Sequence, residues 1–441
     1  MADSNTVVTT QSYFSRIGDS IKGIGIGAIL FIVAFPLLFW NEGRAVKTAK
    51  ALKEGAKTVI SVESDKVDPA NQDKLIHFSG KTATPDVLMD PIFQISYNGI
   101  ALRRKVEMFQ WVENTTTETK KKVGGSEETK TTYTYAQEWC ENAIDSSNFN
   151  QSADHVNPPM SYKEEKYVAK HVTVGAFTLP ENMISSISGE QTFPIDEAAA
   201  APVLAAIPNA YRLLDGTGYY VAAGDAIGTP AGCAPKVAAA AAQTVGTVVN
   251  AVSNLQNSAQ NAQQTGNTIA NAAVGTARAP AIGDVRITFY VIPQQKDVSI
   301  IAQQVGNSLA SYQITKDRSI QMLSSGIKTA DEMFTSAQKG NAMMTWILRI
   351  VGFFVMYTGL KMVFGPLGVL ADVLPFLGSL VRMGTGLLSF LIALPCSLVT
   401  IAIAWIVYRP LLGIVLLVVA VAAIVMLFKS RKSAPATAVA A

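Results

Sequence analysis

Residues 346–428 read WILRIVGFFVMYTGLKMVFGPLGVLADVLPFLGSLVRMGTGLLSFLIALPCSLVTIAIAWIVYRPLLGIVLLVVAVAAIVMLF, and this apolar block decides the class of protein. Roughly 20 apolar residues cross a bilayer as a helix, so the block can hold three crossings, within 346–364, 384–408 and 411–428. The alternative is a buried helical hairpin of a soluble protein. The last two runs follow each other with Arg409 as their only charge, so the sequence predicts an integral membrane protein.

One piece of the block, residues 365–383, is not typical of a span. Its Gly365-Pro366 and Leu374-Pro375 steps break helices, and it also carries two charged side chains. We therefore expect one or two short helices in the membrane interface.

The N-terminal part predicts a fourth span. Residues 1–20 are polar and expected to be disordered, whereas residues 21–40 are apolar apart from Lys22 and are expected to cross the membrane. A cleaved signal peptide is the alternative, but the residues that follow lack a small-residue cleavage pattern. We therefore expect a retained anchor, continued by a membrane-proximal helix over residues 41–57.

Between these apolar parts, residues 58–328 predict a β-rich domain. Short β-type runs are separated by Asp, Pro, Asn and Gly. A long hairpin is expected to begin near Ile100–Glu113, with a charged, mobile tip over residues 115–130. A capping-box pattern, Thr329 followed by Glu332, predicts a helix over residues 329–364 that leads into the membrane.

Residues 232–277 form an Ala-rich segment inside this domain, with Lys236 as its only charged side chain. Small and apolar residues recur in steps of three and four, which indicates a heptad seam. Such a helix is weak by itself, so we expect it to pack against a partner, including its own copies in a homo-oligomer. A flexible linker is the alternative.

Composition limits the classes of function. The net charge of +3 is too small to indicate nucleic-acid binding. Cys140, Cys233 and Cys396 lie too far apart in sequence for a metal or redox motif, although the first two could pair in an oxidising compartment. The three histidines form no metal-ligand spacing. We expect no cofactor, no metal and no enzymatic activity.

Four spans would place both termini on one side of the membrane and the β-rich domain on the other. Counts of basic residues near the span ends are equal on the two sides, so they do not orient the chain. The strongest local signal is the basic start of the tail 429–441, which favours a cytoplasmic C-terminus. The expected fold is therefore an α+β membrane protein with four transmembrane helices and a large β-rich extracytoplasmic domain between the first two.

The assembled motifs resemble the LUMA family, four-span proteins known in animals from the inner nuclear membrane and endoplasmic reticulum. The resemblance covers nearly the whole chain in order, and its clusters follow the first span, lie on the expected hairpin and recur in the membrane block. The residues taken as family-motif structural residues are Asn41, Glu42, Gly43, Arg44, Arg103, Arg104, Glu107, Gln110, Trp111, Trp139, Arg349, Arg409 and Pro410.

The resemblance implies cytosolic or nucleoplasmic termini, a large lumenal domain and self-association. In animals the family is associated with organising nuclear-membrane complexes that include emerin and lamins. The segment 232–277 departs from the animal pattern, and its Ala-rich texture favours a bacterial relative. The expected location is then the bacterial inner membrane with a periplasmic domain, or the inner nuclear membrane and endoplasmic reticulum in a eukaryote.

Three classes of function are carried forward. The leading hypothesis is a membrane scaffold that binds the bilayer and other membrane or envelope proteins through its β domain. The second is a channel or transporter component or channel regulator, supported by Arg349 and Lys361, because charges inside spans mark pathways. Snorkelling of both side chains is the simpler explanation. The third is a hydrolase using His155 with Asp154, or His171, but no nucleophile motif accompanies them.

Overall fold

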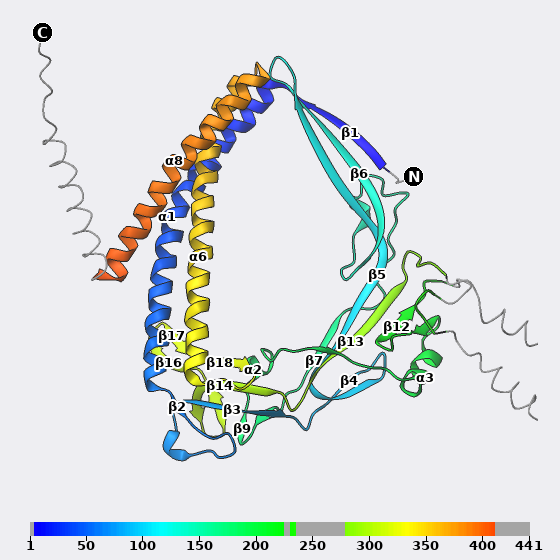
Figure 1. Ribbon diagram of the computed structural model, residues 1–441. Helices are drawn as coiled ribbons and strands as arrows, with labels where there is room; N and C mark the ends of the chain where they lie inside the picture. The colour runs from blue at the N-terminus through cyan, green and yellow to red at the C-terminus, as the bar shows by residue number, and fades with distance from the viewer. Residues whose placement is uncertain (1–3, 225–229, 235–277, 411–441) are drawn as a thin grey trace, which may run out of the picture.

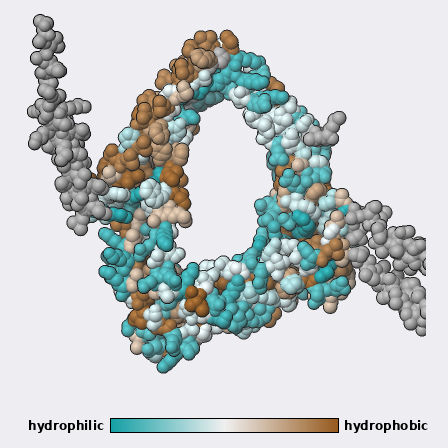
Figure 2. Space-filling model, viewed as in Figure 1, coloured by the Kyte–Doolittle hydropathy of each residue, from teal (hydrophilic) through white to brown (hydrophobic). Residues whose placement is uncertain are grey.

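A computed structural model describes residues 4–224, 230–234 and 278–410. These residues form a ring: long helices make one side, two sheets make the base, and a long hairpin returns to the far end of the helices (Figure 1). Figure 2 shows the opening enclosed between the helices and the hairpin. The expected fourth span, 411–428, the tail 429–441 and most of the Ala-rich segment lie outside the described residues.

The described residues contain six α-helices, three of them long. Three helices are long and apolar enough to cross a membrane, which accounts for three of the four expected spans. Their bounds are α1 Tyr13–Thr58, α2 Glu181–Ile184, α3 Glu197–Ala206, α6 Ala330–Val363, α7 Gly365–Ala371 and α8 Pro375–Tyr408.

Local chemistry explains where the long helices begin. Ser12 caps α1 by accepting a hydrogen bond from the backbone N–H of Ser15. Thr329 and Glu332 form the predicted capping box at the start of α6. Pro375 begins α8, since proline is tolerated in the first turn of a helix. Of the expected interfacial pieces, α7 is thus a separate helix and the rest is the first part of α8.

The strands form a nine-stranded sheet, a seven-stranded sheet and a two-stranded ribbon. The first contains β1, β4–β7 and β10–β13; the second contains β2, β3, β8, β9, β14, β15 and β18. The bounds are β1 Ser4–Gln11, β2 Ile60–Ser61, β3 Leu75–Ala83, β4 Val87–Asp90, β5 Ile95–Lys121, β6 Glu127–Cys140, β7 Glu165–Val168, β8 Thr173–Val174, β9 Phe177–Thr178, β10 Gln191–Thr192, β11 Ala210–Arg212, β12 Gly218–Val221, β13 Val285–Pro293, β14 Asp297–Val305, β15 Ser308–Ala310, β16 Tyr312–Thr315, β17 Arg318–Ile320 and β18 Met322–Ser325.

We call the two sheets and their loops, without the far half of the hairpin, the head. Its main core lies between the sheets and includes Phe78, Phe177 and Phe289, which are fully buried. A second cluster joins the head to the helices, because Leu52 of α1 and Phe334 of α6 pack together with strand residues. The helices therefore continue rigidly into the head.

The predicted hairpin is formed by β5 and β6, which pair from Met108↔Cys140 to Lys121↔Glu127. Its tip contacts other parts of the chain, where a mobile tip was expected: the Gly124 N–H donates to the carbonyl of Val373 at 3.0 Å. Positive φ angles at Gly124 and Gly125 allow the tight turn. The hairpin thus closes the ring.

The N-terminus differs from the expected disordered segment. Ser4–Gln11 forms β1, which pairs antiparallel with β6 along its full length, from Ser4↔Thr134 to Gln11↔Glu127. Its alternation of Thr and Val suits a strand, and the outer edge of β6 supplies main-chain partners that a local reading of the N-terminus cannot reveal.

Candidate functional site

One site lies where α1, α6 and α8 meet at the head-side end of their apolar stretches. We call it the Glu42 cluster: Asn41, Glu42, Arg44, Asn341, Thr345, Arg349 and Trp405. The Glu42 side chain is fully buried and accepts from Arg349 Nε at 2.6 Å, Arg349 Nη2 at 2.9 Å and Trp405 Nε1 at 2.8 Å. One carboxylate thus joins three helices.

The polar residues around this ion pair extend the connection between α1 and α6. Asn41 donates to the carbonyl of Thr345 at 3.0 Å, and Arg44 donates to Asn341 Oδ1 and to Thr345 Oγ1, both at 3.2 Å. Asn341 in turn donates to the carbonyl of Ala45 at 3.0 Å. The network specifies which turn of α6 lies against which turn of α1.

The remaining predicted residues of the membrane block lie next to this cluster. A Cβ on Gly43 would meet the ring of Tyr408 at 2.6 Å, so only glycine lets α8 approach this closely. The Arg409 guanidinium lies over the Trp405 ring at 5.9 Å. Pro410 is exposed at the end of the described residues. Asn41, Glu42, Gly43, Arg44, Arg349 and Arg409 are therefore brought together.

Burying two charges is costly, and good geometry must offset that cost. Arg349 meets Glu42 with two parallel hydrogen bonds, the strong form of this pair. The Arg349 guanidinium also lies 4.7 Å from the Trp346 ring and 5.6 Å from the Trp405 ring. Arg349 is therefore a partly buried partner of the buried Glu42, whereas snorkelling or a pathway was expected. Lys361 is exposed.

A second site lies at the opposite end of the apolar stretches, where the hairpin tip meets the helices. We call it the Asp372 cluster: Arg16, Lys121, Glu127, Asp372 and Arg382. Asp372 is fully buried and accepts from Arg16 at 2.6 Å and from both terminal nitrogens of Arg382 at 2.5 and 2.7 Å. Lys121 Nζ lies 3.1 Å from the same carboxylate.

Two further contacts attach the hairpin tip to α1. Arg16 also donates to the carbonyl of Gly125 at 2.5 Å and pairs with Glu127 at 3.0 Å. A neighbouring contact attaches α1 to α7, because the Tyr13 hydroxyl donates to the carbonyl of Leu370 at 3.2 Å. Burial raises the pKa of Asp372, but the hydrogen bonds from Arg382, Arg16 and Lys121 outweigh it and lower the pKa to about 2. The tip is therefore held by an ionised carboxylate.

The other predicted residues lie on the large sheet. Buried Arg104 pairs with buried Asp90, and Arg103 pairs with Glu164 at 3.0 Å and Glu190 at 2.8 Å. These contacts tie β5 to the neighbouring strand and loops, which makes them structural contacts of the head.

Further along β5 and β6, aromatic and polar residues form a second structural group. Gln110 is fully buried and donates to the carbonyl of Asn142 at 2.7 Å. Arg286, which pairs with Glu107 at 3.5 Å, lies 4.0 Å from the Trp139 ring. These contacts connect β5, β6 and β13 across one face of the sheet.

The histidines of the hydrolase hypothesis have structural surroundings. His155 is buried between the rings of Trp111, at 4.6 Å, and Tyr135, at 3.7 Å, and its Nδ1 lies 3.0 Å from the carbonyl of Gln151. Exposed His171 pairs with Asp86 at 3.0 Å. Within the ranges 4–224, 230–234 and 278–410, no group of three or more His, Cys, Asp or Glu could hold a metal ion.

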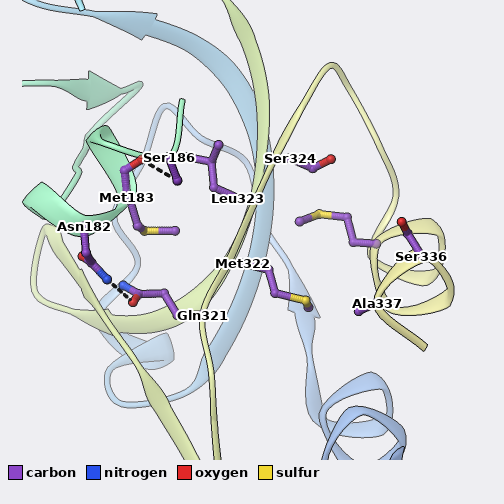
Figure 3. Close-up of a pocket in the computed structure, with 10 residues that line it drawn as sticks. Asn182, Met183, Ser186, Gln321, Met322, Leu323, Ser324, Ser336 and Ala337 are labelled. Atoms are coloured by element: carbon purple, nitrogen blue, oxygen red, sulfur yellow. Dashed lines mark hydrogen bonds between the residues drawn. The ribbon is translucent and has the colours of Figure 1, made fainter. Parts of the chain in front are cut away.

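A cavity of about 460 Å³ opens on the head between α2, β18 and α6. Met183, Met322 and Met333 supply apolar lining, and Asn182 and Gln321 hydrogen-bond at 2.7 Å beside them (Figure 3). Met183 and Met333 are almost fully buried, and Met322 is partly exposed. This hollow is a candidate site for docking another protein.

The sequence profile described as transmembrane protein 43 matches residues 108–410. The chain belongs to the transmembrane protein 43 family. This is the family expected above under the name LUMA, and the match begins on the hairpin and ends just after Arg409. The matched range contains every residue of the Asp372 cluster except Arg16.

Known members of the transmembrane protein 43 family align along almost the whole chain. The human protein is 28% identical over 436 residues, which cover 96% of this chain and 93% of the human one. The mouse protein is 28% identical over 410 residues, with 90% and 88% covered. The Drosophila homolog is 24% identical over 400 residues, with 89% and 90% covered. No solved structure matches the chain.

These relatives of the transmembrane protein 43 family come from animals, and none of them supports a bacterial origin. Sequence reasoning missed most of the Asp372 cluster and the pairing of Glu42 with Arg349. One signal could have indicated both: each charge lies at the edge of an apolar run, where an unpaired charge would be costly. Its partner, however, lies hundreds of residues away in sequence.

Proposed function

We propose that this transmembrane protein 43 family member is a non-enzymatic membrane scaffold that organises membrane protein complexes through its head. The observation that carries the proposal is that the charged residues of the two clusters join one structural element to another. Glu42, Arg349 and Asp372 each bind one structural element to another, which is how a rigid frame is built. A rigid frame with a large, varied head surface suits a protein whose role is to hold others.

Membrane placement follows from the same arrangement. The Glu42 and Asp372 clusters bracket the apolar parts of α1, α6 and α8, so each would lie near one face of the bilayer. The animal relatives fit the endoplasmic reticulum and inner nuclear membrane as the location. We propose that the head lies on the lumenal side.

The methionine-lined cavity gives the scaffold proposal a defined test. A photo-crosslinking amino acid at Ser336, which lines the cavity, is expected to capture discrete membrane proteins in native membranes. The matched control is Gln338, which is exposed two residues further along α6 and so points elsewhere. Equal capture at both positions, or capture at neither, would contradict docking at this cavity.

A channel or channel-regulating role is the second candidate. Its earlier support from Arg349 weakens, because that charge is paired with Glu42. A different feature favours it: the polar hairpin extends from the head to the Asp372 cluster and faces the apolar helices across the opening of the ring (Figure 1). Planar-bilayer recording distinguishes the two candidates. A scaffold gives no reproducible conductance, whereas a conductance lost in the Thr117→Trp variant of the hairpin would favour the channel.

A further inference from the structure

The far half of the hairpin, together with β1, forms a three-stranded sheet with no hydrophobic core. We call it the arm: β1, residues 114–121 of β5 and residues 127–134 of β6. Residues 114–120 are all exposed, and β1 alternates between exposed and half-buried residues. A sheet this thin normally needs a hydrophobic face packed against something else. The arm therefore lacks the usual means of stabilising itself.

The arm also lies at the depth of the bilayer if the helices cross it, which rests on the membrane placement proposed above. Arg16 and Glu42 are about 26 residues apart on α1, or about 39 Å at 1.5 Å per residue. That length covers the hydrocarbon layer of about 30 Å. Because the tip contacts Arg16 and the hairpin starts in the head, the arm must pass through this depth.

Lipid is an unsuitable surrounding for such a sheet. The arm carries Glu118, Lys120 and Lys130, and charged groups are expensive in hydrocarbon. Its outer strands also have main-chain groups that pair with no other strand, and the membrane interior tolerates β-structure only when the strands close on one another. Water would solvate the charged side chains, and strands from a neighbouring molecule would pair with the free main-chain groups.

The two free edges of the arm match each other. β1 and β5 are both antiparallel to β6, so they run in the same direction. Ser4 and Asn114 share the partner Thr134, and Gln11 and Lys121 share Glu127. The two edges therefore have equal length and the same register against β6. As a result, β1 of one copy can pair in parallel with β5 of the next copy without tilting the copies.

The β1 edge carries none of the usual protection against pairing. Soluble proteins blunt edge strands with charged residues, proline or bulges, but β1 reads SNTVVTTQ and pairs with β6 in unbroken register. Asn5 bonds to Asn150 near one end and Gln11 to Asp19 at the other. Among the described residues no strand pairs with its outer edge.

We infer that copies of this chain assemble edge to edge through the arm, β1 of one copy pairing with residues 114–121 of β5 in the next. The contact uses two different surfaces, so it repeats from copy to copy and closes only as a ring. The polar arms then face the interior of the ring, away from lipid, and the apolar helices face lipid outside.

Cysteine crosslinking in the full-length chain in liposomes tests this interface. In a background with the three native cysteines replaced by alanine, Val7→Cys is combined with Thr117→Cys. Both residues pair with Thr131, so within one copy they lie two strand spacings apart, about 10 Å. That exceeds the roughly 7 Å that a disulfide spans, so any disulfide joins two copies. Thr115→Cys and Thr119→Cys test neighbouring registers on the same face.

The expected result is a ladder of dimers, trimers and larger species that takes up most of the chain on oxidation. The control pairs Thr117→Cys with Val156→Cys. Val156 lies in the head and is 61% exposed, so its thiol is more accessible than one at half-buried Val7, yet the control should give at most a tenth of that yield. No ladder in any register, dimers alone, or disulfides only to a different protein would overturn the inference.

A second variant guards against failure of the cysteine-free background. Val8→Lys, at a side chain already 54% exposed, places a charge on the open edge of the otherwise native chain. The assembly mass in nanodiscs should fall from several copies to one or two, with unchanged circular dichroism; an unchanged assembly mass would overturn the inference. Crosslinking to other proteins at Ser336 is scored separately, so scaffold and ring can fail independently.

Discussion

At the scale of single residues, two buried carboxylates connect distant parts of the chain. Glu42 holds Arg349 and Trp405, and Asp372 holds Arg16 and Arg382. A buried ion pair adds little net stability compared with apolar packing, but removal of one partner leaves an uncompensated charge in a low dielectric. The two acids therefore specify a unique arrangement of helices.

We predict that Glu42→Gln destabilises the protein by about 3 kcal/mol, because the partly buried Arg349 guanidinium would lose its negative partner. Denaturant unfolding in mixed micelles measures the loss. Glu54→Gln is the matched control, since Glu54 is exposed on the same helix, and it should change the free energy of unfolding by less than about 0.5 kcal/mol. Equal changes in the free energy of unfolding of the two variants would show that the Glu42–Arg349 pair does not stabilise the fold more than an exposed glutamate does.

We predict that the hairpin tip loosens as pH falls from about 4 to about 2. The folded-state pKa of Asp372 is lowered to about 2, below the ordinary value near 3.9. Its stabilising contribution is therefore present above the ordinary value and is lost as pH falls through the folded value. The protection of the Gly124 and Gly125 amides against hydrogen exchange, relative to the intrinsic exchange rate at each pH, should fall over this range. In Asp372→Asn, exchange there should already be fast at pH 7.

At the scale of elements, close helix contact depends on a few glycines. A Cβ on Gly27 would meet the carbonyl oxygen of Gly359 at 2.6 Å, and one on Gly359 would meet that of Gly27 at 2.7 Å. Gly25 has nothing within 4 Å of its Cβ position. Among Gly23, Gly25 and Gly27, Gly27 is thus the one that lets α6 approach, while a Cβ on Gly23 would only touch Met362.

We predict that Gly359→Val separates α1 from α6 and destabilises the protein by about 2–3 kcal/mol, since backbone atoms cannot yield to the added methyl groups. Thermal unfolding in detergent measures this. Gly340→Val on the same helix has open space around its Cβ position and should be neutral or slightly stabilising, because valine forms helix better than glycine. A similar loss in both variants would indicate a propensity effect instead.

At the scale of the whole molecule, the chain is a closed ring whose joints are chemically distinct. Apolar packing of Leu52 and Phe334 joins helices and head, whereas charged contacts with Arg16 join the arm to the helices. The charged joint is itself largely buried, because Arg16 is 7% exposed and Asp372 0%, so salt screens it only weakly. The two joints therefore hold the ring by different forces.

We predict that residues 235–277 can be replaced by a short Gly-Ser linker without unfolding the head. Pro230 and Arg278 form a β-bridge, and the Ala231 N–H donates to the carbonyl of Arg278 at 3.1 Å, so the two ends already meet. Circular dichroism and the unfolding midpoint should match the full chain. Loss of the Val7–Thr117 crosslink ladder in this variant would show that the segment, and not the arm, holds the copies together.

Local patterns determined much of this fold from the sequence alone. Apolar runs marked the membrane helices, the Thr329 capping box marked the start of α6, and alternation marked the hairpin, because each signal depends on residues close together in the chain. β1 shows the limit: its strand forms only because β6 offers an edge more than a hundred residues away. Most of the predicted motif residues lie in contacts that join one element to another, but the sequence did not reveal their partners.

Tertiary structure alone decided which charges meet. Glu42 and Arg349 are 307 residues apart, and Arg16 and Asp372 are 356 apart. No local preference connects residues so distant; they meet because antiparallel packing of α1 and α6 and return of the hairpin close the ring. The sequence determined that apolar helices and a polar hairpin exist, and the energetic need to pair buried charges decided how they are joined.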